Sequence, residues 1–238
     1  MLSAKCQVLS VVTNEDKPAG RHLKLTPNPV KVMAQKYNIP VHTSHLIPLL
    51  NSGEGKPQQG EVVGIVAAYG QIIKQEVLDS FGGQMYNIHP SLLPKYRGPS
   101  PLQQQILDGV IETGVTIIKM DSQMDHGPIV GTACDTIRPD DTTITLGNRL
   151  FEMGADWLIN SPLSPLLNQE RGTRQREVSY TPQNHNEATY TKKLTKQDGF
   201  VKYEELASRS QEIERKKRAF TPWPGTWSIN SKGERIKL

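Results

Sequence analysis

The chain has little cysteine. Its 238 residues include only two, Cys6 and Cys134, and they lack CxxC spacing. Such a chain is not a disulfide scaffold, and the pattern predicts two buried free thiols in a reducing compartment. No apolar run approaches the roughly 18 residues that a membrane span needs, and no signal peptide is recognised at the start. We therefore expect a cytoplasmic protein of bacterial type, with a eukaryotic organelle as the alternative if the natural chain begins further upstream.

Several common catalytic signatures are also missing. The sequence contains no GxSxG, no HExxH and no cluster of metal ligands, so neither a nucleophile elbow nor a zinc site is expected. The stretch NSGEGKP, residues 51–57, resembles a phosphate-binding loop but lacks the pattern GxxxxGK[ST]. There is no internal repeat that would indicate a solenoid. These absences exclude several enzyme classes and leave the polar residues near strand ends as candidates.

The charge balance is mild. Lys and Arg number 28 against 24 Asp and Glu, which gives a net charge of +4. This balance permits an anionic partner such as RNA without requiring one, so the position of the basic residues matters more than their number. The length is sufficient for a real hydrophobic core.

Apolar runs alternate with amphipathic stretches over the first two thirds of the chain. Strands are expected at residues 7–13, 38–42, 61–69, 84–88, 114–120 and 128–137, and helices at 30–37, 74–80, 101–110 and 143–160. Asn28 and Pro29 form an N-cap and first-turn pair, and the nearly continuous apolar run 61–69 suits a strand buried on both faces. The alternation predicts an α/β domain with a Rossmann-like, mostly parallel sheet and helices on both faces.

The last third of the chain is organised differently. The segment around residues 169–202 is polar and reads as a linker. A helix is expected at 203–220 with Leu206, Ile213 and Phe220 inward, followed by a hairpin with a Lys-Gly turn. We therefore expect a main domain at 1–168, the linker at 169–202 and the beginning of a small, OB-like β-barrel domain at 203–238.

Asn87 and His89 lie two residues apart near the end of a predicted strand. Side chains alternate along a strand, so both point to one side. In open parallel sheets, ligands bind at the carboxyl edge, and these two groups would face such a site. Pro90, Pro94 and Gly98 limit the freedom of the following loop. Taken alone, the pair would equally suit a role in capping backbone groups.

Two carboxylates follow another predicted strand. Asp121 comes directly after the predicted strand at 114–120, and Asp125 comes shortly before a Gly-Pro turn. An Asp beside a His fixes the imidazole tautomer and stabilises its charged form, as acid–base catalysis requires. Without a histidine nearby, two Asp residues in a turn would be solvated groups in an Asx-turn.

The stretches NIHPSLLPKYRGPSP, residues 87–101, and TGVTIIKMDSQMDHGPI, residues 113–129, together resemble the signature of the folate-dependent formyltransferases. The resemblance implies that Asn87, His89 and Asp125 form the catalytic set. It also implies transfer of a formyl group from 10-formyltetrahydrofolate to an amine, with neither a covalent enzyme intermediate nor a metal. The family's folate-binding segment matches Ser91, Leu92, Leu93 and Pro94, with Asp121 nearby; burial of both leucines in the core is the alternative.

Other stretches resemble the branch of the family whose acceptor is methionyl initiator tRNA. TNEDKPAGRHLKLTPNPVK, residues 13–31, is similar to the loop that this branch inserts to reach the acceptor end. The resemblance implies that Arg21 enters the acceptor stem, with Lys17 and Lys24 adding positive charge. YTKKLTKQDGFVKYEEL and RAFTPWPGTW are similar to the branch's linker and the entry to its C-terminal domain. The expected partners are Met-tRNA and the folate, and the expected state is a monomer.

The chain departs from the family pattern at both ends. The family's first strand, with its Gly-Thr-Pro-type turn, has no counterpart before Met1, and most of the C-terminal domain has none after Leu238. We therefore expect a chain cut at both ends. Three alternatives stay open: formyl transfer to a small amine such as glycinamide ribonucleotide or an amino sugar nucleotide, hydrolysis of the formyl folate, and an inactive fragment that binds RNA or folate.

Overall fold

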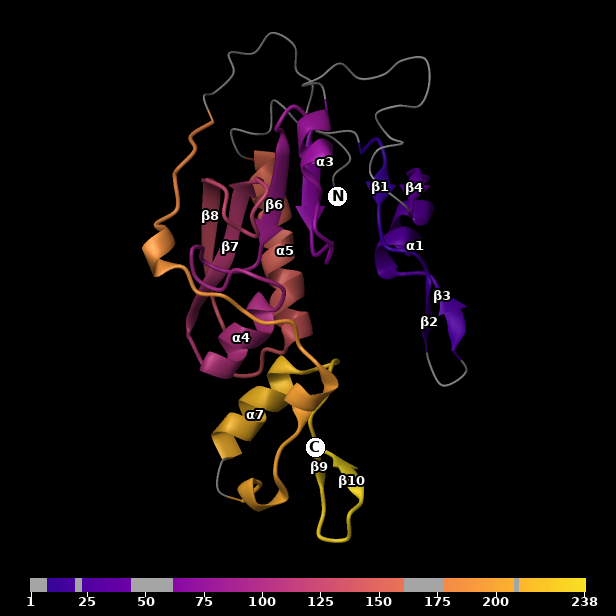
Figure 1. Cartoon of the computed structure of the whole chain (residues 1–238), viewed down its shortest axis with the longest axis vertical. Coiled ribbons are helices and arrows are strands. Elements are labelled where there is room, and N and C mark those ends of the chain that lie inside the picture. The colour runs from indigo at the N-terminus through magenta and orange to yellow at the C-terminus, as the bar shows by residue number, and fades with distance from the viewer. Residues whose placement is uncertain (1–7, 20–22, 44–61, 161–177, 208–209) are drawn as a thin grey trace. The chain divides into compact units, whose positions relative to one another are not determined.

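The computed structural model describes residues 8–19, 23–43, 62–160, 178–207 and 210–238. The chain divides into two compact units. Unit 1 comprises Met1–Tyr86 and Leu158–Val178, and unit 2 comprises Asn87–Trp157 and Ser179–Leu238. Figure 1 shows the helices and strands of both. No helix in the described ranges is long and apolar enough to cross a membrane.

Unit 1 begins with a parallel strand pair and a helix. β1 (Val11–Val12) pairs with β4 (Val41–His42), and α1 (Pro29–Lys36) lies between them in the sequence. The predicted helix start is confirmed, because Asn28 Oδ1 accepts a hydrogen bond from the backbone N–H of Lys31 and Pro29 occupies the first turn. Between β1 and α1, β2 (Lys17–Ala19) and β3 (Lys24–Thr26) form an antiparallel hairpin.

A four-stranded sheet has the order β5–β6–β7–β8. In unit 1, β5 (Gly64–Ala67) and α3 (Gln75–Ser80) precede β6 (Met85–His89), whose first two residues belong to this unit. The prediction that residues 61–69 are buried on both faces is wrong for the strand itself, since Ile65 is 41% exposed and Ala67 is exposed as well. The apolar residues of β5 are common in strands whether or not the strand is covered, so they indicate a strand without indicating burial on both faces.

In unit 2, β6 continues to His89 and is followed by α4 (Pro101–Asp108), β7 (Glu112–Lys119) and β8 (Ile129–Thr136). β7 and β8 are antiparallel, which departs locally from the expected parallel pattern. The reason is the short connection between them, because parallel neighbours need a long crossover. The thiol of Cys134 is exposed, so the expectation of two buried thiols is wrong for this residue; Cys6 lies outside the described residues.

The core of unit 2 lies between the sheet and α5 (Thr143–Asn160). Leu146 and Leu150 are fully buried, as the predicted helical spacing requires. A Cβ on Gly154 would lie 2.5 Å from Ile88 and 3.1 Å from Val115, so glycine lets the helix approach β6 and β7 closely. This packing supports β6, the strand on which both Asn87 and His89 lie.

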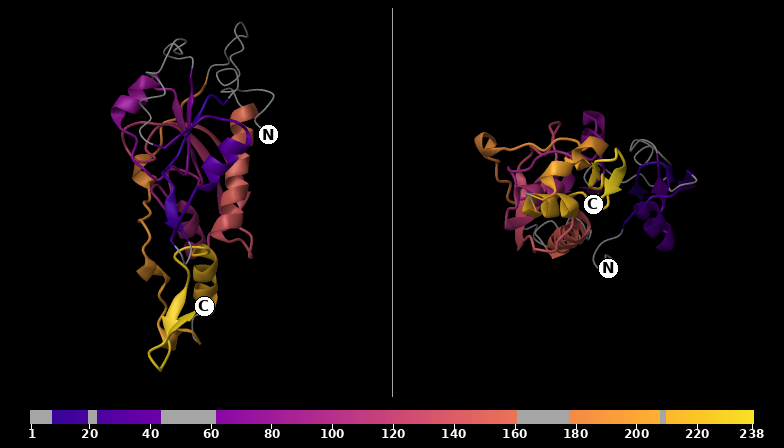
Figure 2. Two further views of the ribbon diagram at one scale, coloured as in Figure 1. Left: turned by 90° about the vertical axis from the view of Figure 1, so that its right-hand side faces the viewer. Right: turned by 90° about the horizontal axis from the view of Figure 1, so that it is seen from below.

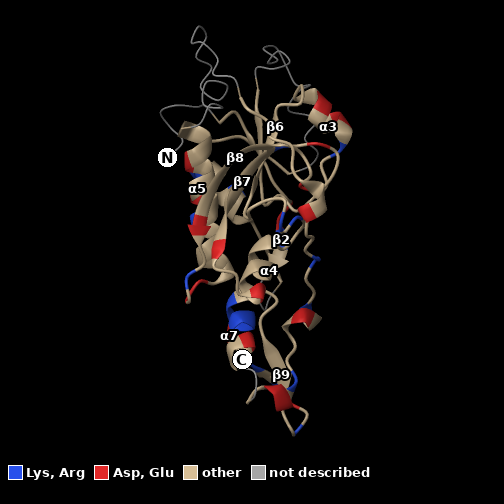
Figure 3. Cartoon of the chain, turned by 90° about the vertical axis from the view of Figure 1, so that its left-hand side faces the viewer, with Lys and Arg blue, Asp and Glu red and all other residues tan. Residues whose placement is uncertain are grey.

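The C-terminal part of unit 2 begins as an extended chain with short 3₁₀ turns at His185–Glu187, Lys196–Gly199 and Tyr203–Glu205. α7 (Ser210–Ala219) follows, seven residues later than the expected helix start, and Ile213 is buried. β9 (Trp227–Ile229) and β10 (Arg235–Lys237) then form the predicted hairpin, visible beyond α7 in Figure 2. Figure 3 shows the basic end of α7, where positive charge complements the helix dipole.

A buried carboxylate joins β8 to the start of α5. Asp141 Oδ1 and Oδ2 accept hydrogen bonds from Arg149 at 2.9 and 2.6 Å, and Oδ2 also accepts one from the N–H of Arg138. The Arg149 hydrogen bonds are the largest cause that lowers the pKa of Asp141 to about 2. Since the folded-state pKa lies below the ordinary 3.8, the ionised carboxylate stabilises the fold above that value, and this stabilisation disappears as the pH falls towards 2.

We expect Asp141→Asn to lower the free energy of unfolding by about 2 kcal/mol at pH 7. Urea unfolding at pH 7, pH 4 and pH 2.5 measures it, and the difference between the variant and the wild type should shrink at the lowest pH. Asp140→Asn, one residue earlier and exposed, is the control. A pH-independent difference would contradict the electrostatic origin.

Candidate active site

Three polar side chains of unit 2 meet between β6 and the turn after β7. Asn87 and His89 belong to β6, and Asp125 belongs to the turn at residues 120–128. Asn87 Nδ2 donates to Asp125 Oδ1 at 3.2 Å, and His89 Nδ1 lies 3.5 Å from the same oxygen. The structure thus brings together the three residues that the sequence predicts as a catalytic set.

The imidazole of His89 is held at both nitrogens. Nε2 lies 2.9 Å from the backbone oxygen of Tyr96, which can only accept, so Nε2 carries a proton. Nδ1 faces Asp125. Burial is the largest influence and lowers the pKa of His89, the charge of Arg97 lowers it further, and Asp125 and the Tyr96 carbonyl raise it. At neutral pH the ring is therefore neutral on balance, and any imidazolium that forms is stabilised by the adjacent carboxylate.

The carboxylate of Asp125 accepts two hydrogen bonds and lies beside the ring of His89. Besides the contacts to Asn87 and His89, its Oδ2 accepts the backbone N–H of Gly98 at 2.8 Å. Asp125 has a φ of 51°, a left-handed conformation that Asp adopts more readily than most residues.

Asp121 lies in the same turn but faces another partner. Its Oδ1 accepts the N–H of Gln123 in an Asx-turn, and its Oδ2 lies 2.7 Å from His126 Nδ1. The ring of His126 stacks on that of His185, with centroids 4.1 Å apart. Asp121 therefore lies in the same turn as Asp125 without contacting His89 through any hydrogen bond found in the described chain.

The predicted folate segment is largely turned inward. Ser91 is fully buried and its hydroxyl donates to the carbonyl of Lys95, while Leu93 is only 8% exposed. Leu92 and Pro94 are partly exposed. The side chains that can meet a ligand directly are thus those of Leu92 and Pro94, and the other two residues shape the loop from within.

The predicted tRNA residues lie in unit 1. Lys17 and Lys24 are exposed on the β2–β3 hairpin, where Lys17 is paired with Thr26 and Lys24 with Ala19. Arg21 lies outside the described residues. The hairpin itself carries exposed apolar residues, Leu23 at 73% and Leu25 at 63%.

Four groups at this site were not predicted as functional. The carbonyl of Tyr96 and the N–H of Gly98 contact His89 and Asp125 through the backbone. Arg97 and Gln183 are buried and hydrogen-bonded to each other, and Gln183 also contacts the turn of Asp125. Nothing in the sequence pattern marked Gln183 as buried, because this residue lies in a polar stretch that resembles a solvated linker.

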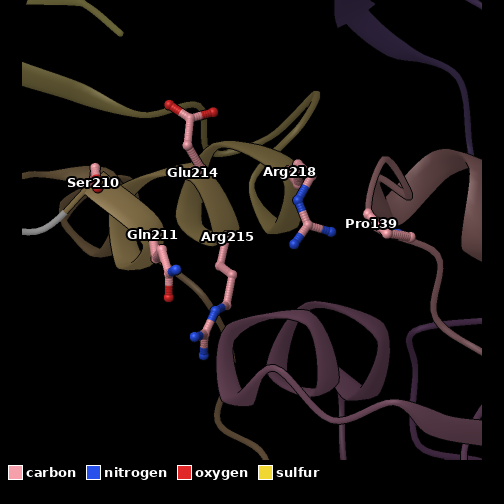
Figure 4. Close-up of a pocket in the computed structure, with 6 residues that line it drawn as sticks. All are labelled: Pro139, Ser210, Gln211, Glu214, Arg215 and Arg218. Atoms are coloured by element: carbon pink, nitrogen blue, oxygen red, sulfur yellow. The ribbon is translucent and has the colours of Figure 1, made fainter.

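A separate pocket of about 270 Å³ lies on unit 2 away from these residues. It is lined by α7 and Pro139, and in Figure 4 the side chains of Arg215 and Arg218 point to the opposite side of α7 from that of Glu214. It contains no His–Asp pair, and we assign no catalysis to it. Among the described residues, no group of three or more His, Cys, Asp or Glu is placed to hold a metal ion.

The comparisons with known proteins agree with one another. The formyl transferase family matches residues 2–161, and its C-terminal domain matches residues 193–238. Methionyl-tRNA formyltransferase from Chloroflexus aurantiacus (strain ATCC 29366 / DSM 635 / J-10-fl) is 40% identical over 229 residues, which cover 96% of this chain and 70% of that relative.

Solved structures show the same fold at lower identity. A 4-N formyltransferase from Francisella tularensis has a TM-score of 0.66 at 19% identity, covering 88% of this chain and 81% of its own. HypX from Aquifex aeolicus, in complex with tetrahydrofolic acid, has a TM-score of 0.63 at 21% identity, covering 87% and 34%. On these matches the chain belongs to the formyl transferase family.

Proposed function

We propose that the protein transfers a formyl group from 10-formyltetrahydrofolate to the α-amine of methionine esterified to initiator tRNA, which supports translation initiation. The observation that carries the proposal is the contact of Asn87 and His89 with one carboxylate oxygen of Asp125. The acceptor is inferred from relatives such as the C. aurantiacus protein, which is named methionyl-tRNA formyltransferase.

Asn87 would stabilise the negative charge that develops on the formyl oxygen. Its Nδ2 has two N–H groups, and one is directed to Asp125. The other can donate to the oxygen of the tetrahedral species, and one such donor is worth roughly 3–4 kcal/mol. Its place on β6, within the packed sheet, keeps this donor preorganised.

His89 and Asp125 would take up a proton as a unit. A neutral amine attacks the formyl carbon, the new C–N bond forms, the bond to folate N10 breaks, and one proton passes from the amine to N10. His89 Nδ1, 3.5 Å from Asp125 Oδ1, can hold that proton between the two steps, and the carboxylate stabilises the imidazolium. The neutral ring expected at pH 7 suits a group that first acts as a base.

The folate would lie against the loop that follows His89. Leu92 and Pro94 offer partly exposed apolar surface for its flat rings, while Ser91 and Leu93 support the loop. Asp121, with its side chain 35% exposed, adds a carboxylate for polar atoms of the pterin edge.

The tRNA would contact two parts of the chain, the basic residues near the β2–β3 hairpin and the C-terminal segment. Arg21, Lys17 and Lys24 would contact the acceptor end, because Arg binds phosphate through two N–H groups and stacks on bases. We also propose that residues 1–168 form the catalytic domain, 169–202 a linker and 203–238 part of a tRNA-binding domain. The family matches at 2–161 and 193–238 support two domains, although the second match begins within the proposed linker.

Formylation of Met-tRNA, glycinamide ribonucleotide and an amino sugar nucleotide, each measured with 10-formyltetrahydrofolate, tests the proposal. We expect turnover only with Met-tRNA. Formate release without any acceptor would identify a hydrolase, and formylation of a small amine alone would refute the proposed acceptor. Arg21→Ala in the same assay should raise the KM for Met-tRNA and change kcat little, because the proposal gives Arg21 a role in binding the tRNA and none in the chemical step.

A further inference from the structure

Residues 183–191, which we call the bracing segment, contact two loops of the proposed site. One is the loop that follows His89, and the other is the turn that carries Asp125. Arg97 and Tyr190 form a parallel β-bridge, with the N–H of Arg97 donating to the carbonyl of Thr189 and the N–H of Thr191 to the carbonyl of Arg97. At its start, Gln183 is 5% exposed and reaches the turn that carries Asp125. One segment therefore contacts both sides of the site.

The amide of Gln183 closes the turn around Asp125. Its Nε2 donates to the carbonyl of Asp125 at 2.9 Å and to the carbonyl of Gly127 at 2.7 Å. These two bonds satisfy backbone oxygens of a turn in which Asp125 has a left-handed φ of 51°. Because the carboxylate of Asp125 lies on the same residue, its direction towards His89 depends on this turn.

Arg97 in turn holds Gln183. Its side chain is buried, and Nε and Nη2 both donate to Gln183 Oε1, at 3.2 and 2.6 Å. Its other hydrogen bonds reach Tyr190 Oη at 3.1 Å and His185 Nδ1 at 2.8 Å. None of the ion pairs found in the described chain involves Arg97, so this buried charge is solvated by neutral acceptors of the bracing segment.

The same segment fixes the group that binds His89 Nε2. The N–H of Tyr96 donates to Thr189 Oγ1 at 2.8 Å, while the carbonyl of Tyr96 lies 2.9 Å from Nε2. Tyr96 has a φ of 62°, which costs a non-glycine residue about 1 kcal/mol and persists only where neighbours hold it. The bracing segment is such a neighbour.

We propose that Gln183 is a positioning residue for formyl transfer, which, held by Arg97, fixes the turn that points Asp125 at His89. The inference rests on the proposed function for its kinetic test. The side chain of Gln183 makes two separable sets of hydrogen bonds. Its NH2 group donates to the carbonyls of Asp125 and Gly127, and its oxygen accepts from Arg97. The two ends of one side chain can thus be tested separately.

Gln183→Met removes donors and acceptor, whereas Gln183→Glu keeps an oxygen for Arg97 but has no donor for the two carbonyls. We expect both to lower kcat by about 30-fold, with the KM for Met-tRNA within about twofold. Gln183→Glu should lose some stability, because the carbonyls of Asp125 and Gly127 lose their donor, but its carboxylate pairs with Arg97 and should keep the protein folded. Asn186→Ala, exposed in the same segment, is the control and should keep full activity. Wild-type kcat in Gln183→Glu would overturn the proposal.

An NMR titration of His89 gives a readout that needs no acceptor. The groups that act on this imidazole are Asp125, Arg97 and the Tyr96 carbonyl. If the turn is released in Gln183→Met, the raising effect of Asp125 weakens and the pKa of His89 falls below its wild-type value. An unchanged titration would overturn the positioning role. A wild type that formylates nothing, together with a shifted titration, would refute the proposed function and leave the positioning role standing.

Discussion

Replacing Asp125 with asparagine should lower kcat for formyl transfer by about a thousandfold. Asparagine has nearly the same shape and tolerates the left-handed φ of 51° at this position, so the turn should persist. Its amide oxygen can still accept from Gly98, as Asp125 Oδ2 does at 2.8 Å. What disappears is the negative charge 3.5 Å from His89 Nδ1, with its stabilisation of the imidazolium, and the oxygen that accepts from Asn87 Nδ2.

Single-turnover kinetics with Met-tRNA and a thermal melt of the same preparation measure this prediction. The melting temperature should change by a few degrees at most, and Asp140→Asn, an exposed position after β8, should keep wild-type kcat. Loss of Asp125 also removes an influence that raises the pKa of His89, so that pKa should fall. A variant with more than a tenth of wild-type kcat would show that the carboxylate is not required.

The sequence predicted the part of the site that follows from local rules. Asn87 and His89 lie on one side of β6 because side chains alternate, and the strand was recognisable from its apolar neighbours. The match to a family signature placed Asp125 with them, although it lies in a different turn. The order of helices and strands in residues 28–43 and 62–160 was likewise predicted, since each has its own periodicity or cap.

The remaining features depend on contacts that no local pattern encodes. The exposure of β5 depends on which neighbours cover it, and an apolar strand looks the same in sequence either way. Gln183 lies 86 residues from Arg97, in a stretch as polar as any linker. The tertiary contacts, not the composition, make this glutamine buried. A sequence pattern cannot distinguish it from exposed neighbours such as Asn186.

Replacing Gly127 with alanine should damage both the fold and the reaction. A Cβ at this position would lie 1.9 Å from the backbone oxygen of Lys119, at the end of β7. No side chain can rotate away to relieve that overlap, so the strand end and the turn must separate. We expect a loss of about 3 kcal/mol in the free energy of unfolding and at least a 100-fold fall in kcat, because Asp125 moves with the turn.

Urea unfolding and Met-tRNA kinetics of Gly127→Ala test this, with Gly147→Ala in α5 as the matched control. There a Cβ would meet only the end of the Leu102 side chain at 3.0 Å, and alanine favours a helix by up to about 1 kcal/mol. The control should therefore change stability by no more than about 1 kcal/mol and leave kcat unchanged. If Gly127→Ala has the stability and kcat of the control, the position of Asp125 does not depend on the close contact between Gly127 and Lys119, and the prediction is wrong.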